Sequence, residues 1–194
     1  TFGVEAKSPN LLFIAIDDLN DWVGCMGGHP QAKTPNIDRL AKRGTLFLNA
    51  HCQGPICGPS RASLLSGFYP HTTGVYQQPN AKPMERDETF FHGQLLTHYL
   101  SGQGYRTLGV GKITHGYRAE KALDEYGGKF AGSGPKPAQG KRFNYHLPDV
   151  PWTGTQTDWG AFPNDDKDMP DHKAADWAVE QLSKRINKPL FFDQ

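Results

Sequence analysis

Three short segments of this sequence combine residue types that could act together on an anion. The first is Cys57-Gly58-Pro59-Ser60-Arg61, which pairs a thiol with a guanidinium group. The second is the acid doublet Asp17-Asp18, and the third is Lys112-Ile113-Thr114-His115. Together they offer a nucleophile, two cations, an imidazole that titrates near neutrality and two carboxylates.

The segment around Cys57 is expected to place its nucleophile at an anion-binding position. Residues 60 to 66 predict a short helix that ends at Gly67, so Cys57 lies just before a helix start. The positive end of the helix dipole and the free N–H groups then point at a bound anion. Arg61 adds a fixed fork of donors that suits sulfate or phosphate oxygens. Cys57 and Arg61 are therefore candidate catalytic residues.

The other two segments supply carboxylates, a second cation and a proton carrier. Asp17 and Asp18 are adjacent, and two neighbouring carboxylates repel each other unless a cation is present. A hard divalent ion with oxygen ligands, Ca²⁺ or Mg²⁺, meets that need. Lys112 offers a point charge to an anionic oxygen, and His115 can carry a proton at neutral pH. Both are candidate catalytic residues, with a loop lysine and a structural histidine as the alternative.

Strands and helices alternate along the chain, which is typical of an α/β fold with a mostly parallel sheet. The run at residues 10–16 is apolar after Asn10, as in a strand buried on both faces. Ligands in such folds sit beyond the carboxyl ends of the strands, so Asp17, Asp18 and Lys112 are expected to meet in one crevice. The expected strands are 10–16, 45–51, 105–111 and 189–192, and the expected helices are 35–43, 60–66, 92–100 and 172–186, the last capped by Asp171.

Composition narrows the class of protein. The 194 residues can form one domain, and 22 Gly with 15 Pro indicate many turns and loops. A net charge of +1 gives no support for binding to nucleic acid or to a membrane surface, and no apolar run is long enough to span a bilayer. The three cysteines, Cys25, Cys52 and Cys57, form neither a disulfide framework nor a CxxC zinc pair.

The segments together resemble the type I sulfatase family, in its iduronate-2-sulfatase-like branch. The resemblance is carried by NLLFIAIDDLNDWVGCMGGHPQAKTPNIDRLAKRG, LNAHCQGPICGPSRASLLSG and YRTLGVGKITHG. It implies an alkaline-phosphatase-like sandwich with a central, mostly parallel sheet. Residues 1–194 would form the N-terminal catalytic part of that domain. Residues 117–170, rich in Gly, Pro and aromatic side chains, are expected to be a substrate-facing insertion.

The same resemblance implies roles for the five polar residues. In that family Cys-x-Pro-Ser-Arg directs oxidation of the cysteine, so Cys57 is expected to become formylglycine. The aldehyde hydrates to a geminal diol, which gives one oxygen to attack sulfur and a second to expel the product. Asp17, Asp18 and the modified Cys57 would bind Ca²⁺, with Mg²⁺ as the lesser choice. Lys112 would contact the sulfate group, and His115 the formylglycine oxygen.

The resemblance also implies a substrate and partners. It indicates hydrolysis of sulfate monoesters, with a sulfated sugar or polysaccharide as the substrate. The implied partners are a formylglycine-generating enzyme, or an anaerobic sulfatase-maturating enzyme, and a C-terminal chain that completes the domain. The first residues, TFGVEAKSPN, look like a mature start after a removed signal, which favours a periplasmic or secreted location, or a lysosomal one in a eukaryote.

Two other functions are open at this level. Phosphodiesterases and phosphonate monoester hydrolases of the same superfamily can share the Cys-x-Pro-Ser-Arg nucleophile. The spacing around Lys112 favours sulfate esters over phosphodiesters and phosphonate monoesters as the substrate. A protein of another class, an inactive fragment or carbohydrate-binding module, is the second alternative. It is suggested because the resemblance places the family's later Asp-His metal pair in a further stretch of sequence, after Phe192. An apolar strand begins at Pro189 close to Gln194, so we expect the sheet to continue elsewhere.

Overall fold

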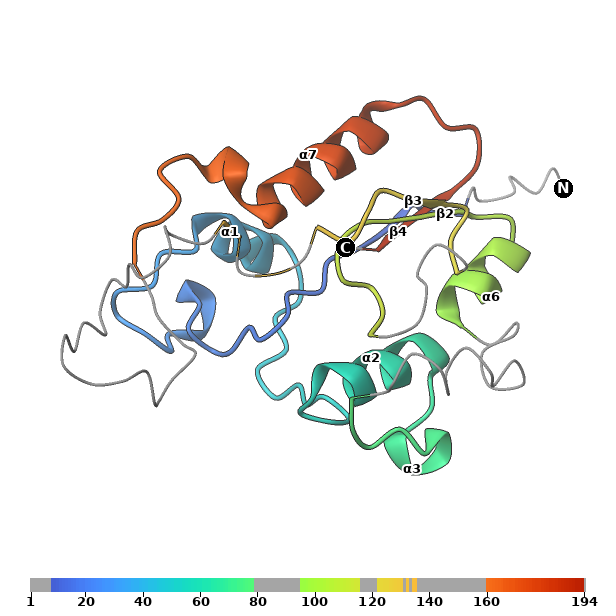
Figure 1. Cartoon of the computed structure of the whole chain (residues 1–194), viewed down its shortest axis with the longest axis horizontal. Coiled ribbons are helices and arrows are strands. Elements are labelled where there is room, and N and C mark those ends of the chain that lie inside the picture. The colour runs from blue at the N-terminus through green and yellow to red at the C-terminus, as the bar shows by residue number, and fades with distance from the viewer. Residues whose placement is uncertain are drawn as a thin grey trace, which may run out of the picture.

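A four-stranded parallel sheet is the centre of the structure. The computed structural model describes residues 8–78, 95–115, 122–130, 132, 134–135 and 160–193. The strand order is β1-β4-β2-β3, and every neighbouring pair is parallel. The parallel sheet with helices (Figure 1) confirms the predicted α/β class. The strands are β1 (Leu11–Phe13), β2 (Arg106–Gly109), β3 (Glu125–Tyr126) and β4 (Leu190–Asp193).

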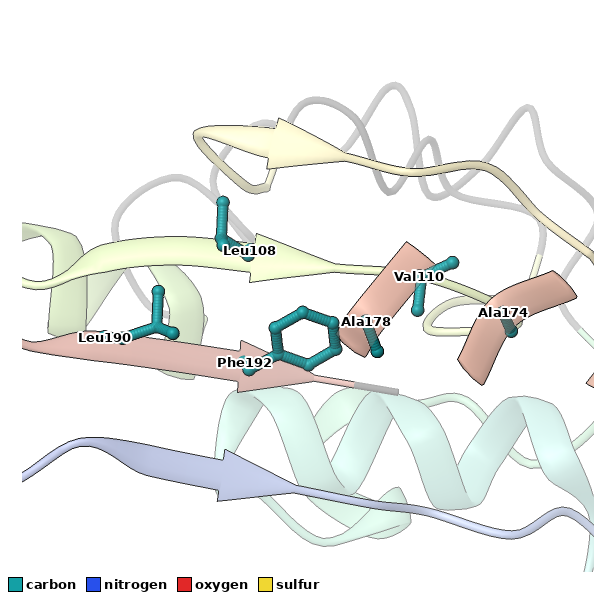
Figure 2. Packing of buried hydrophobic residues seen from close by; sticks show 6 residues of the cluster. All are labelled: Leu108, Val110, Ala174, Ala178, Leu190 and Phe192. Atoms are coloured by element: carbon teal, nitrogen blue, oxygen red, sulfur yellow. The ribbon is translucent and has the colours of Figure 1, made fainter. Parts of the chain in front are cut away.

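Helix α7 (Pro170–Ser183) covers one face of the sheet because its small residues allow close approach to the strands. Ala174 and Ala178, one turn apart, pack against β2 and β4 (Figure 2). Trp177 adds a tilted ring contact with Phe192 at 5.7 Å between centroids. The buried members of this cluster, the α7 cluster, are Leu108, Val110, Ala174, Ala178, Leu190 and Phe192.

Helix α2 (Cys57–Ser66) lies on the opposite side of the sheet from α7 (Figure 1). Leu65 of this helix is buried with Leu95, Ile113 and Ala122. Ile113 lies just beyond the carboxyl end of β2, so this packing brings the helix to the edge of the sheet where ligands bind in such folds. The remaining elements are η1 (Gly24–Met26), α1 (Pro35–Arg43), α3 (Pro70–Thr73), α6 (Leu96–Gly102) and η3 (Asp166–Asp168).

Several predicted elements are confirmed with small shifts at their ends. Helix α1 has the predicted bounds, and the strands at 105–111 and 189–192 are β2 and β4. Helix α2 begins at Cys57 rather than at residue 60, so the nucleophile is the first helical residue instead of preceding the helix. Asp171 lies in the first turn of α7, whose N-cap is Met169. Of the helix predicted at 92–100, residues 92–94 lie outside the described part, and α6 accounts for the rest.

Two strand predictions are wrong, and both involve missing neighbours. The run at 10–16 was expected to be buried on both faces, but β1 is three residues long and lies at the edge of the sheet. Ile14 and Ile16, which follow it, are each 53% exposed. Residues 45–51 form no strand, and Phe47 and Leu48 are exposed. A strand needs a partner for its backbone hydrogen bonds, and the described residues place none beside this segment.

The described part of the chain contains no helix with the length and apolar character needed to cross a membrane. Most of the predicted insertion at 117–170, including residues 136–159, lies outside the described residues.

Candidate active site

A tight turn after β2 presents Lys112 and His115 to the edge of the sheet. Gly111 has a φ of 86°, which a residue with a Cβ rarely adopts. Its N–H donates to the carbonyl oxygen of Gly128 at 2.8 Å, and its carbonyl oxygen accepts from the Tyr126 hydroxyl at 2.7 Å. These two bonds fix the direction in which the chain leaves the strand.

Helix α2 presents the nucleophile and the arginine on one side. Cys57 is its first residue and Arg61 is four residues later, which is one turn of an α-helix. The N-cap residue is Ile56, whose side chain accepts no hydrogen bond. The N–H groups of the first turn are therefore left for partners from outside the helix, at the positive end of the helix dipole.

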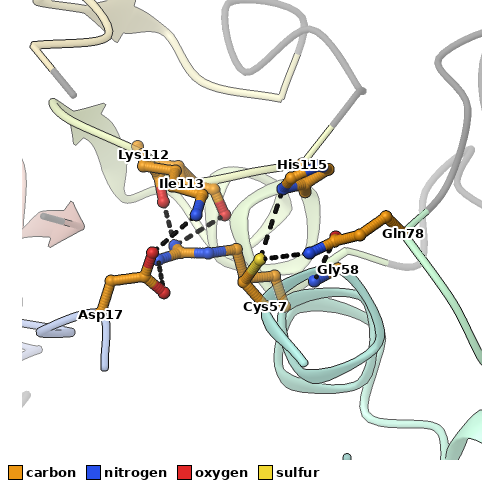
Figure 3. Close-up of polar contacts among 8 residues, drawn as sticks. Asp17, Cys57, Gly58, Gln78, Lys112, Ile113 and His115 are labelled. Carbon is orange, nitrogen blue, oxygen red and sulfur yellow. Dashed lines mark hydrogen bonds and ion pairs between the residues drawn. The ribbon is translucent and has the colours of Figure 1, made fainter. Parts of the chain in front are cut away.

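Asp17 joins both cations of the site. Its Oδ1 accepts from a terminal nitrogen of Arg61 at 3.0 Å, and its Oδ2 accepts from Lys112 Nζ at 2.6 Å (Figure 3). The other terminal nitrogen of Arg61 donates to the carbonyl oxygens of Lys112 and Ile113. One guanidinium thus connects α2 to the segment that follows β1 and to the turn after β2.

The charges of these residues shift one another's pKa values. The hydrogen bond from Lys112 is the main cause that lowers the pKa of Asp17, with Arg61 adding to it and partial burial opposing. Burial alone would lower the pKa of Lys112, but the hydrogen bond and charge of Asp17 and the charge of Cys57 raise it overall. Asp17 is therefore ionised and Lys112 is protonated at neutral pH.

Two side chains contact the sulfur of Cys57. His115 Nδ1 lies 3.5 Å from Sγ, and Gln78 Nε2 donates to Sγ at 2.7 Å (Figure 3). Partial burial, followed by the positive charge of Lys112, lowers the pKa of His115. Its imidazole is therefore neutral at pH 7 and can accept a proton.

The structure brings together Cys57, Arg61, Lys112 and His115 with Asp17. The parallel-strand rule predicted the meeting of Asp17 with Lys112. Asp18 follows at the same strand end, where it is exposed and has a φ of 58°, a left-handed conformation that aspartate tolerates. Gln78 could not be singled out from sequence, because it belongs to none of the three motifs and contacts Cys57 only through the folding of the chain after α3.

Asp193 is a second residue that the sequence did not single out. It ends β4, between β1 and β2, and is 4% exposed. Burial raises its pKa to about 6, although the positive charge of Arg61 opposes that shift. A buried acid thus lies in the part of the sheet that leads to the site.

The described residues offer the right type of ligand atom for a divalent metal ion but too few ligands. Asp17 and Asp18 carry the hard oxygen donors that Ca²⁺ and Mg²⁺ prefer. Asp17, however, already accepts from two cations. No group of three or more histidine, cysteine, aspartate or glutamate side chains among the described residues could hold a metal ion. Because Ca²⁺ takes six to eight oxygen ligands, this set by itself does not form a calcium site.

Comparison with known proteins gives one consistent family. The family model for sulfatases matches residues 9–192. A sulfatase of Formosa agariphila is 39% identical over 202 residues, which cover 96% of this chain and 38% of that protein. Human iduronate 2-sulfatase is 39% identical over 106 residues, covering 55% of this chain and 18% of the enzyme.

Solved structures agree with this assignment. A 2-O GAG sulfatase superposes with a TM-score of 0.66 at 25% identity, covering 96% of this chain and 34% of that one. A protein solved in complex with its substrate D-glucosamine-2-N,6-O-disulfate gives a TM-score of 0.61 at 25% identity, again over 96% of this chain and 34% of the other. The chain therefore spans less than half the length of these relatives. With the family model matched along nearly its whole length and the motif residues gathered at one sheet edge, this chain belongs to the sulfatase family.

Proposed function

We propose that the protein to which this chain belongs hydrolyses sulfate monoesters through a formylglycine hydrate at position 57. The observation that supports this most directly is the meeting of Cys57, Arg61, Lys112 and His115 in one site. The thiol of Cys57 stands where the two hydroxyl groups of the hydrate would be. A sulfate monoester carries one negative charge, and two fixed cations beside the nucleophile suit a group of that charge.

In the proposed reaction, one hydroxyl group of residue 57 attacks sulfur and the other drives the release of sulfate. One hydroxyl gives its proton to water as its oxygen bonds to sulfur, and the bond from sulfur to the sugar oxygen breaks. The sugar oxygen takes a proton from water and leaves as an alcohol. His115 then takes the proton of the second hydroxyl, the aldehyde C=O re-forms, and sulfate leaves. Water adds to the aldehyde and restores the hydrate.

Lys112 and Arg61 would hold the sulfate oxygens during these steps. Lys112 provides a compact charge, and Arg61 provides directed donors from the first turn of α2. We further propose that Asp17 and Asp18 contribute oxygen ligands to a Ca²⁺ ion, together with residue 57 and with ligands from outside the described residues. When bound, that ion would supply positive charge beside the sulfate group.

The substrate class is proposed from the relatives. A 2-O GAG sulfatase and a protein bound to a disulfated glucosamine are among the structures similar to this chain. A sulfated sugar or polysaccharide is therefore the proposed substrate, with residues 117–170 as the segment that contacts it. We also propose maturation by a formylglycine-generating or anaerobic sulfatase-maturating enzyme, completion of the domain by further C-terminal sequence, and a periplasmic or secreted location.

The test is to produce the longer protein together with a maturation enzyme. Peptide mass spectrometry is expected to find an aldehyde at position 57, and matched aryl esters are expected to be cleaved in the order sulfate before phosphodiester and phosphate monoester. Sulfated uronic-acid disaccharides are assayed next, as candidate natural substrates. Cys57→Ala, which cannot form the aldehyde, is the matched inactive control. Full activity with an unmodified thiol, or a clear preference for phosphodiesters, would contradict the proposal.

A further inference from the structure

Helix α2 takes its N-terminal hydrogen-bond acceptor from a distant residue. The N-cap Ile56 has no side-chain oxygen, so the first N–H groups of the helix lack the usual local partner. The N–H of Gly58 donates instead to Gln78 Oε1 at 3.1 Å. Gln78 reaches this position from the segment after α3, whose helix packs against α2.

This contact fixes the orientation of the Gln78 amide. A backbone N–H can only donate, so the amide atom that faces Gly58 must be the oxygen. The amide nitrogen is then directed at Cys57 Sγ, 2.7 Å away (Figure 3). His115 Nδ1 approaches the same sulfur at 3.5 Å. Residue 57 therefore has a permanent, uncharged donor beside it as well as an imidazole.

We propose that Gln78 is a further active-site residue, which caps α2 through Oε1 and donates an N–H to the reactive atom of residue 57 through Nε2. This inference rests on the proposed function. In the hydrate, the amide would hold one oxygen in place by donation, leaving the other for His115. An amide donates at every pH used by enzymes, whereas the donor capacity of an imidazole depends on its protonation.

Gln78→Glu separates the two contacts. A glutamate keeps an oxygen that can accept from Gly58 N–H, but it offers a second oxygen, and no donor, to residue 57. We expect this variant to retain the melting temperature of the wild type. In the complete, matured enzyme we expect kcat/KM for an aryl sulfate to fall about a hundredfold, as when one donor to a developing oxyanion is removed. Gln78→Ala is expected to lose activity as well. Gln77→Glu, one residue earlier on the exposed chain, is the matched control and should retain activity.

A second readout does not depend on sulfatase activity. In unmatured protein, the rate at which iodoacetamide alkylates Cys57 can be followed by peptide mass spectrometry, with Cys25 and Cys52 as internal references. A glutamate beside the sulfur disfavours the thiolate, so Gln78→Glu is expected to slow alkylation of Cys57 about fivefold. Gln77→Glu should leave it unchanged.

The outcomes distinguish the two proposals. If the wild type cleaves no sulfate ester but Gln78→Glu slows alkylation, the proposed function fails and the contact stands. If Gln78→Glu retains both its alkylation rate and its kcat/KM, Gln78 serves only as a helix cap and the inference is wrong. If the glutamate variant proves unstable, the alanine variant decides, because unchanged kcat/KM in Gln78→Ala also contradicts the proposal.

Discussion

The ion pairs of Asp17 predict that removing this carboxylate strengthens anion binding when metal is absent. Asp17 accepts from Lys112 Nζ at 2.6 Å and from Arg61 at 3.0 Å, and these are the two cations that the proposed function assigns to sulfate. A sulfate ion must therefore compete with a carboxylate that is already in place. Asp17→Asn keeps the size of the side chain and removes its charge, so both cations become available to the anion.

The expected size of the effect follows from the exposure of the three side chains. Asp17 is 37% exposed, Lys112 25% and Arg61 12%, so water screens the two pairs considerably. Pairs of this kind are worth about 0.2–1 kcal/mol each. Freeing both cations thus corresponds to about 1 kcal/mol, or a Kd for sulfate that falls about fivefold.

Calorimetric titration with sodium sulfate in EDTA-containing buffer, at constant ionic strength, measures this change directly. Asp18→Asn is the matched control, because Asp18 is the exposed neighbour and lies outside these two ion pairs. It should change the Kd less than twofold. A weaker affinity in Asp17→Asn than in the wild type would refute the reasoning, since it would mean that Asp17 orients the cations for the anion instead of competing with it.

Two further predictions concern stability. Leu108 is fully buried in the α7 cluster, so Leu108→Ala should reduce the free energy of unfolding in urea by about 2–5 kcal/mol. Leu182→Ala, at a position 45% exposed, should change it by about 0.5 kcal/mol at most. Asp193 has a folded-state pKa raised from 3.8 to about 6, so its ionisation costs stability as the pH rises through that range. Asp193→Asn should therefore stabilise the chain by about 1–3 kcal/mol at pH 7.5 and have little effect at pH 4, and an equal effect at both pH values would contradict this account.

The meeting of Asp17 with Lys112 could be predicted from sequence because each residue is tied to a local signal. Asp17 and Lys112 each follow an apolar run, and parallel strands place their carboxyl ends at one edge of a sheet. The structure confirms this rule across 95 residues of sequence, since the two side chains form an ion pair. The α/β class was predictable for the same reason, from the alternation of strand and helix patterns.

The errors arose where a local pattern needed a partner that the pattern itself does not describe. Residues 45–51 have the composition of a strand, but a strand exists only beside another, and Phe47 remains exposed. Gln78 belongs to no recognisable motif, because its amide forms hydrogen bonds with Gly58 and Cys57, which are distant from it in the sequence. The pairing of Asp17 with Arg61 was likewise not predictable, since sequence supplies the charges but not the distances between them.

Arg61 illustrates why the site depends on the type of residue as well as on charge. Its guanidinium uses one terminal nitrogen for Asp17 and the other for the carbonyl oxygens of Lys112 and Ile113. These bonds hold three segments at fixed angles, which only a planar fork of donors can do. A lysine at this position could match the charge, but its three donors radiate from one nitrogen and form no planar fork. Arg61 therefore assembles the site, because the turn that carries Lys112 and His115 is bound to the same helix that carries Cys57.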